Sequence, residues 1–397
     1  MTHDESPSLN TDSGHKRRLP WPIIAATLAT TLSVATVGGI WIYTARTFHT
    51  DPFSHWRYPI SHLSTFQAHK WGLTVSVLRY EPKNDVLLSQ TEIGRVTGER
   101  DKIKLWQGVT QTPLSTIVPD YPYAFLSLSA DQKQLAVADW EGTLTMLTAT
   151  ERGENPQQVE DSAAWQKSHI TDLKNQGRTN GLAITRDGKT VAISRWADGP
   201  QTYSDLSVIN VQTKQILYRF DMADSLEANS RVGGFSPDGK LLALARSNYR
   251  IELLDTTTGK VLHKLVSAHQ PTSRRLSADT QIAFSEDSER LLLGTPESVE
   301  LWSAKTGDRL RTFVYSDRDT GWETDAIALS PNNKWIAAAN FGTTYLWSAE
   351  TGRLLRTIPE PENVKSIASL AFSSDSRRLF GGTLDGKIVS WQLPIRL

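Results

Sequence analysis

The sequence predicts an all-β chain of repeated four-stranded antiparallel units, preceded by one transmembrane α-helix. Two short phrases that recur along residues 66–397 indicate the repeated units. A run of 21 uncharged residues near the N-terminus indicates the helix. The length of 397 residues fits one large domain with an appendage. The equal numbers of basic and acidic residues, 43 each, argue against a general affinity for nucleic acid.

The N-terminal segment is predicted to anchor the chain in a membrane. Residues 1–22 form a polar tail with three consecutive basic residues at 16–18, and residues 23–43 suffice for a helix to cross a bilayer core of roughly 30 Å. Only Arg46 follows on the other side, so we expect a cytoplasmic N-terminus and an extracytoplasmic body, either periplasmic or extracellular. A cleaved signal peptide is the alternative, although its apolar region usually has about 7–15 residues. Residues 44–58 would be a tether.

The first recurring phrase is Ser or Thr, any residue, then Asp or Asn, placed between an apolar pair and an apolar run. It begins at Ser129, Thr185, Ser236, Ser285, Ser330 and Ser373. A stretched first copy without this turn spans Val77–Asp85. Such residues between apolar runs are typical of a tight turn between two strands. Successive copies lie 56, 51, 49, 45 and 43 residues apart, which is the length of one repeated unit.

The second recurring phrase predicts a third and a fourth strand. It alternates apolar and polar residues and ends in Trp or Leu; the tryptophans at this position are Trp106, Trp302, Trp347 and Trp391. We expect these four side chains to lie in the core. A Thr-Gly turn then leads into another strand, as at residues 258–259, 306–307 and 351–352. Four antiparallel strands in about 45 residues is the pattern of one β-propeller blade.

These phrases resemble those of the WD-repeat β-propeller family, and the resemblance covers residues 59–397. The repeats are degenerate: the Trp-Asp pair appears as Trp-Ser, Leu-Asp, Trp-Gln or Leu-Thr, and the Gly-His pair as Ala68-His69 and Ala268-His269. The resemblance implies seven blades, with most of the family's Asp–His–Ser/Thr–Trp networks missing. Because the chain ends after a third strand, residues 59–66 are expected to complete the last blade and remove its open edge.

The resemblance also implies that the second strands end around the central mouth of one face. We expect a partner-binding surface there, because aromatic and arginine side chains on loops suit binding. The candidate residues are Gln90, Asp139, Trp140, Arg178, Arg195, Trp196, Arg231, Arg246, Tyr249, Asn340 and Phe341. The arginines favour an acidic peptide or a phosphate-bearing ligand. Alternatively, Trp140 and Trp196 fold onto their own blades.

The longest insertion, residues 151–177, is expected to lie between the second and third blades. Within it, residues 162–174 place Trp165, His169 and Leu173 four residues apart, which predicts a short helix. We expect this helix to pack against the rim or to lie over the candidate binding surface.

The sequence contains no catalytic motif, and no catalytic residue, cofactor or metal is predicted. The chain has no cysteine, which excludes disulfides and thiolate metal sites. The leading interpretation is a membrane-anchored, non-enzymatic scaffold that binds a protein or peptide. One alternative is a lactonase-like or quinoprotein-like propeller enzyme that uses the central channel. Another is a cytosol-facing scaffold, if the topology is inverted.

Overall fold

Every element of the chain that the structure describes is a β-strand. The computed structural model describes residues 60–69, 73–81, 86–92, 103–107, 113–117, 125–131, 133–149, 165–173, 177–197, 203–221, 230–246, 249–267, 281–315 and 324–393. All of them belong to the compact unit Phe53–Leu397. The predicted polar tail, transmembrane helix and tether, residues 1–58, lie outside the described residues. Within the ranges given, no helix is long and apolar enough to span a bilayer.

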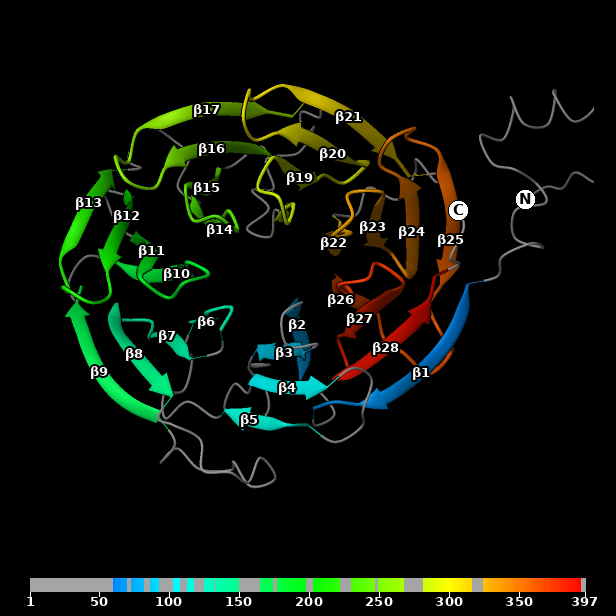
Figure 1. Ribbon diagram of the computed structural model, residues 1–397, viewed down its shortest axis with the longest axis horizontal. Helices are drawn as coiled ribbons and strands as arrows, with labels where there is room; N and C mark the ends of the chain where they lie inside the picture. The colour runs from blue at the N-terminus through cyan, green and yellow to red at the C-terminus, as the bar shows by residue number, and fades with distance from the viewer. Residues whose placement is uncertain are drawn as a thin grey trace, which may run out of the picture. The chain divides into compact units, whose positions relative to one another are not determined.

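The described strands form seven antiparallel sheets of four strands each, arranged as the blades of a propeller (Figure 1). Blade 1 consists of β2 (Thr74–Glu81), β3 (Val86–Glu92), β4 (Ile103–Gln107) and β5 (Ser115–Ile117). Blade 2 consists of β6 (Phe125–Leu128), β7 (Gln134–Ala138), β8 (Thr143–Ala149) and β9 (Trp165–Asp172). Blade 3 consists of β10 (Arg178–Ile184), β11 (Thr190–Ala197), β12 (Tyr203–Asn210) and β13 (Ile216–Asp221). Blade 4 consists of β14 (Arg231–Phe235), β15 (Leu241–Arg246), β16 (Arg250–Asp255) and β17 (Val261–Val266).

The remaining blades follow the same order, so the predicted seven-bladed all-β propeller is confirmed. Blade 5 consists of β18 (Ile282–Phe284), β19 (Arg290–Gly294), β20 (Ser298–Ser303) and β21 (Arg309–Val314). Blade 6 consists of β22 (Ala326–Leu329), β23 (Trp335–Asn340), β24 (Thr343–Ser348) and β25 (Leu354–Pro359). Blade 7 consists of β26 (Ile367–Phe372), β27 (Arg378–Thr383), β28 (Lys387–Gln392) and β1 (Ser61–Gln67). The first strands surround the centre, and the fourth strands form the periphery (Figure 1).

Blade 7 takes its outer strand from the N-terminal end of the described chain. β1 pairs antiparallel with β28, from Ser61 opposite Gln392 to Gln67 opposite Lys387. The hydroxyl groups of Ser64 and Ser390 lie 2.8 Å apart across this pair. Strands from both ends of the propeller therefore close the ring, which gives the third strand of blade 7 a partner on its outer side.

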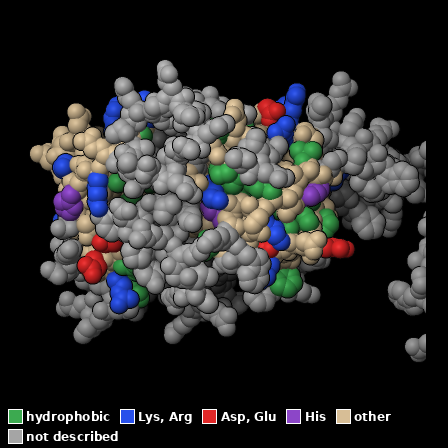
Figure 2. Space-filling view, turned by 90° about the horizontal axis from the view of Figure 1, so that it is seen from below, with side chains coloured by type: hydrophobic (Ala, Val, Ile, Leu, Met, Phe, Trp, Pro, Cys, Tyr) green, Lys and Arg blue, Asp and Glu red, His purple; other side chains and the backbone are tan. Residues whose placement is uncertain are grey.

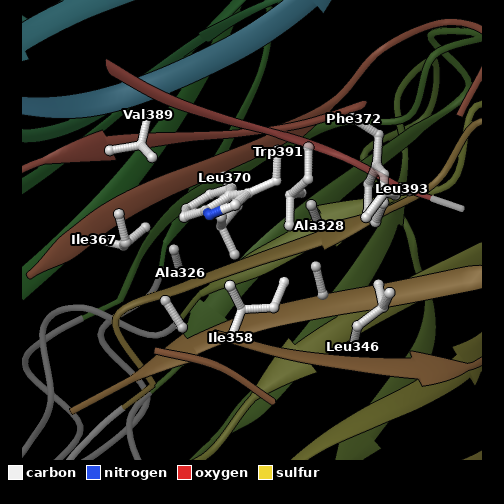
Figure 3. Packing of buried hydrophobic residues seen from close by; sticks show 13 residues of the cluster. Ala326, Ala328, Leu346, Ile358, Ile367, Leu370, Phe372, Val389, Trp391 and Leu393 are labelled. Atoms are coloured by element: carbon white, nitrogen blue, oxygen red, sulfur yellow. The ribbon is translucent and has the colours of Figure 1, made fainter. Parts of the chain in front are cut away.

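The hydrophobic core lies between neighbouring blades. The four tryptophans predicted to anchor it are confirmed there, because Trp106, Trp302, Trp347 and Trp391 are all buried on third strands. Figure 3 shows Trp391 in the middle of the cluster between blades 6 and 7, among side chains such as Leu370 and Ala326. Burial of the aliphatic side chains around it, such as Leu370, contributes roughly 1.5–3 kcal/mol each.

Blade 1 contains part of the hydrogen-bond network that the sequence was expected mostly to lack. The hydroxyl of Ser89 lies 2.8 Å from Nε2 of His69 and accepts the indole N–H of Trp106, also at 2.8 Å. In blades 5, 6 and 7 the residue that corresponds to Ser89 has no hydroxyl: it is Leu293, Ala338 or Gly381. The expectation of mostly missing networks therefore holds in blades 5 to 7, and blade 1 is an exception.

The Ser-x-Asp phrases form six equivalent turns between first and second strands. In each, the Ser or Thr hydroxyl donates to the Asp or Asn oxygen two residues later, at 2.5–2.7 Å. That oxygen also accepts a backbone N–H at 3.0–3.1 Å. The pKa values of four turn acids lie below their ordinary value, at Asp187, Asp238, Asp287 and Asp375. Burial raises each pKa, but the hydrogen bonds together lower it by a larger amount.

These turns require a left-handed backbone at the residue after the turn acid. Gly188 and Gly239 supply it in blades 3 and 4, with φ of 72° and 74°. In blades 5 to 7 the position is taken by Ser288, Asn333 and Ser376, with φ between 57° and 62°. Their side chains join neighbouring turns: Ser288 accepts the N–H of Asp238, Asn333 donates to Asp287, and Ser376 accepts the N–H of Asn332. Backbone strain is thus offset by hydrogen bonds between blades.

The Thr-Gly turns receive side chains from the preceding blade. Gly259 has φ of 70°, and a Cβ atom there would lie 2.6 Å from Cδ2 of Tyr218. Gly307 has φ of 77°, and a Cβ atom there would lie 2.8 Å from Nδ1 of His263. Nε2 of His263 lies 2.9 Å from the carbonyl oxygen of Lys305. Glycine is needed at both turns for its backbone and for the close approach of the neighbouring blade.

The predicted helix over residues 162–174 is wrong, because residues 165–172 form β9, the outer strand of blade 2. The spacing of four residues between Trp165, His169 and Leu173 fits a helix face, but four is also a multiple of the two-residue period of a strand. Pairing with β8 decides between them, since it satisfies the backbone groups of β8 on its outer side.

Candidate binding face

The two ends of the blades differ in the turns that they carry. We call the end with the second-to-third-strand turns, such as residues 139–142, 341–342 and 384–386, the upper face. The end with the six Ser-x-Asp turns is the lower face. Because strands alternate in direction, third-to-fourth-strand connections also lie at the lower face, and connections between successive blades lie at the upper face.

Three upper-face turns display a large apolar side chain at the same position. Phe341 and Leu384 directly follow the last residue of a second strand, and Trp140 occupies the equivalent position of blade 2, two residues after Ala138; their exposed fractions are 60%, 45% and 42%. They belong to blades 2, 6 and 7. Their shared turn position makes these three side chains the candidate contact residues of the upper face.

Phe341 is held in a strained conformation. Its φ is 43° and that of Gly342 is 77°, so both turn residues are left-handed. A left-handed non-glycine residue costs roughly 1–2 kcal/mol. The backbone N–H of Phe341 donates to Oδ2 of Asp325 at 3.2 Å, which helps to hold the turn. The fold thus keeps a large apolar side chain exposed on a strained backbone, a combination that is concentrated at functional sites.

The turn that carries Leu384 is held by a hydrogen bond and an ion pair to Asp385. The hydroxyl of Thr383 donates to Oδ1 of Asp385 at 2.6 Å, and the Lys387 ammonium lies 2.7 Å from Oδ2. Burial raises the pKa of Asp385, but these partners together lower it by a larger amount. The carboxylate is therefore charged at neutral pH. Leu384 was missed in the sequence analysis, and it is identified by the strand register, which gives it the position in blade 7 that Trp140 has in blade 2.

Trp140 lies on a turn that a hydrogen bond to the side chain of Asp139 closes. Asp139, partly buried, accepts the N–H of Thr143 at 2.7 Å. The Trp140 ring makes an edge-to-face contact with Phe125, with centroids 5.8 Å apart. Trp140 therefore packs partly against its own blade and presents the rest of its ring to solvent.

Arg195 and Arg246, which were predicted to line the mouth of this face, have buried guanidinium groups that are paired within their own blades. Arg195 is fully buried; it forms an ion pair with Asp205 and donates to the carbonyl oxygen of Leu173 at 2.7 Å. Arg246 is largely buried and pairs with Glu252 at 2.6 Å. The carboxylates on the neighbouring third strands draw both guanidinium groups inward, so these arginines stabilise blades 3 and 4.

The other candidates divide between the interior and the surface. Tyr249 and Asn340 are buried. The partly buried candidates are Gln90, Trp196 and Arg231, whereas Arg178 is exposed. None of the eleven candidates lines the central cavity, which is surrounded by first strands and the turns that follow them. The second strands of these candidates lie one strand further from the axis than the first strands that line this cavity.

The insertion also differs from its expected place. Its residues 165–172 form β9, the outer strand of blade 2, whereas residues 150–164 lie outside the described residues. Figure 2 shows one side of the molecule, where the coloured apolar, basic and acidic side chains are mixed rather than gathered in one patch.

The described residues hold no group of three or more His, Asp or Glu side chains placed to bind a metal ion. His62 and His69, two of the histidines near the start of the ring, have separate neighbours. Nε2 of His62 lies 2.7 Å from the hydroxyl of Thr65, whereas Nε2 of His69 lies 2.8 Å from that of Ser89.

The fold and its turns define a seven-bladed β-propeller that presents side chains from one face. Residues 352–392, which span β25 to β28, match the family described as WD domain, G-beta repeat. A protein of Synechocystis sp. described as an uncharacterized WD repeat-containing protein is 26% identical over 152 residues, or 38% of this chain. The match spans only 40% of that relative's length.

Proposed function

We propose that this propeller is a non-enzymatic scaffold that binds a protein or peptide on its upper face. The observation that carries the proposal is the display of Trp140, Phe341 and Leu384 from one turn position in three blades. Large apolar side chains that are held by rigid turns lose little entropy on binding, and such residues commonly dominate the energy of an interface.

The lower face offers a weaker case for binding a protein. Its turn residues are engaged with one another, as in the hydrogen bonds from Asp238 to Ser288 and from Asn332 to Ser376. A partner there would have to compete with these contacts. Similarity to WD repeats also favours an interaction role, although it does not name the partner.

The burial of two candidate arginines changes the expected chemistry of the partner. Arg195 and Arg246 are paired within blades 3 and 4, so they do not support the preference for an acidic partner. We therefore place the apolar turns first and the basic residues second in recognition.

We further propose that residues 23–43 anchor the chain and that the propeller lies outside the cytoplasm. The support is the uncharged segment with three basic residues before it and Arg46 after it. Protease added to right-side-out spheroplasts should digest the propeller and spare it in inverted vesicles. The reverse pattern would establish the cytosol-facing topology.

A photo-crosslinking amino acid at position 341 tests the binding face directly. In the full-length chain expressed in its own cells, irradiation should give one dominant crosslinked protein. The matched control places the same amino acid at Leu310, which is 50% exposed on the peripheral strand β21. A product that forms equally from both positions would exclude the upper face, and crosslinking to small metabolites only would favour the enzyme alternative.

A further inference from the structure

The centre of the ring contains a cavity of about 480 Å³ that the proposed scaffold function does not use. Its lining comes from the first strands of six blades and from lower-face turns that follow them. Among its described lining residues, three are charged: Arg79, Arg186 and Glu286. The cavity therefore carries a net positive charge within low-dielectric walls, which strengthens its attraction for an anion.

Arg79 departs from the rule that the other blades follow. At its position, two residues before the turn Ser or Thr, the other first strands carry only small residues: Ser127, Ala183, Gly234, Ala283, Ala328 and Ala371. Arg79 pairs with Leu88 in the same register. Its guanidinium reaches blade 2 and donates to the carbonyl oxygen of Leu128 at 3.2 Å. Six blades close without a cation here, so the fold itself does not require one.

Arg186 already holds a carboxylate across the cavity. It lies on the turn of blade 3, and Nη2 is 2.8 Å from Oε2 and 3.1 Å from Oε1 of Glu286, on the turn of blade 5. Both side chains are about one-third exposed. Two oxygens of one carboxylate thus face one guanidinium nitrogen, and a ligand carboxylate or phosphate fits the same geometry.

We propose that this cavity binds a small polyvalent anion, a di- or tricarboxylate or a phosphate, between Arg79 and Arg186. Glu286 then acts as an internal competitor that occupies Arg186 until the ligand replaces it. The ligand would gain two guanidinium partners in a partly enclosed space, whereas exposed ion pairs elsewhere on the ring contribute little.

Isothermal titration calorimetry on the full-length chain in detergent, at low ionic strength, tests this site. Citrate and inorganic phosphate are titrated separately, and glycerol is the uncharged control. We expect saturable binding of at least one anion, weakened by added salt. Binding of citrate alone would assign a carboxylate ligand, and binding of phosphate alone a phosphate ligand. If neither anion binds saturably, the proposal is wrong.

Variants separate the site from general charge effects. Arg79→Gln and Arg186→Gln should each weaken binding roughly tenfold, as expected for the loss of a charge-assisted contact. Glu286→Gln should strengthen it, because it releases Arg186, and a misfolded protein does not mimic a gain. Arg219→Gln, on the exposed part of β13, should change nothing.

The proposal is overturned if Glu286→Gln fails to strengthen binding, if either arginine variant binds as well as the wild type, or if Arg219→Gln weakens binding as much as they do. Melting temperatures of all variants are measured alongside. Arg186 and Glu286 lie on lower-face turns and Arg79 near the lower end of β2, so partner capture at the upper face should survive these substitutions. Failure of this inference is thereby distinguishable from failure of the scaffold function.

Discussion

The hydroxyl of Ser376 accepts the backbone N–H of Asn332 at 3.2 Å, and so joins the turn of blade 7 to that of blade 6. Ser376 is buried and has φ of 58°, a conformation that glycine adopts without strain. The same residue therefore carries a cost in backbone strain and a gain in contact between blades. Similar hydrogen bonds at Ser288 and Asn333 connect each lower-face turn to the next, from blade 4 to blade 7.

Substitution of Ser376 separates these two effects. Ser376→Ala keeps the strain and loses the hydrogen bond, so it should lower the free energy of unfolding by about 1 kcal/mol. Ser376→Gly loses the same bond but relieves roughly 1 kcal/mol of strain, so it should be nearly neutral. Urea denaturation followed by tryptophan fluorescence measures both. Equal losses for the two variants would show that strain at this turn is negligible.

Arg195 is predicted to be a stabilising residue of blade 3. Arg195→Ala leaves Asp205 without its buried partner and should cost about 3–5 kcal/mol. Arg219→Ala, an exposed arginine of the same blade, should stay within about 0.5 kcal/mol. Replacing both partners, as Arg195→Met with Asp205→Leu, should recover most of the loss. An Arg195→Ala variant as stable as Arg219→Ala would contradict the ion pair.

Two glycines distinguish backbone strain from contact between blades. Gly239 and Gly259 have similar φ values of 74° and 70°, but a Cβ at Gly239 meets nothing closer than 3.7 Å, whereas at Gly259 it meets Tyr218 at 2.6 Å. Both alanine variants should carry roughly 1 kcal/mol of strain. Gly259→Ala should cost at least about 1 kcal/mol more, because Tyr218 must move. Thermal melting of both variants measures the difference, and equal melting temperatures would exclude this contact.

Tyr218 makes the propeller sensitive to alkaline pH. Burial, with a smaller contribution from the Asp255 carboxylate, raises the pKa of Tyr218 to about 12, above its ordinary value of 10. The folded state therefore holds the phenol proton more tightly, so this contribution is intact below pH 10 and is lost between pH 10 and about 12. Tyr218→Phe should flatten the fall in unfolding free energy over that range. Identical pH profiles for wild type and variant would contradict the raised pKa.

The strands of this propeller were predictable from the sequence where turn chemistry marked them. The hydroxyl-to-acid pair at Ser236 and Asp238 is local, so six copies reveal themselves without knowledge of the fold. β9 was not predictable, because its four-residue spacing fits a helix and a strand alike, and only pairing with β8 separates them. Local patterns therefore located the blades, and long-range pairing decided the ambiguous segment.

The binding face was predicted less well than the fold, for a related reason. Arg195 lies opposite Asp205 across β11 and β12, a register that the sequence does not reveal. A charged residue near a strand end was therefore interpreted as exposed, although its partner holds it inside. The expectation for Phe341 came from its place on a loop, and its exposed fraction of 60% agrees with that place. Leu384 emerges only after blades 2 and 7 are aligned by their turns.

The dissociation constant of the crosslinked partner, measured with purified proteins, tests the central claim most directly. The double variant Phe341→Ser with Leu384→Ser should bind about thirtyfold more weakly. Loss of a buried apolar anchor often costs about 2 kcal/mol or more, which corresponds to that change in the dissociation constant. The matched control Leu262→Ser with Leu310→Ser removes two leucines of similar exposure, 49% and 50%, from the peripheral strands, and should bind within twofold of the wild type, that is, within roughly 0.4 kcal/mol. Undiminished binding by the first variant, or an equal loss in the control, would contradict the upper face as the binding surface.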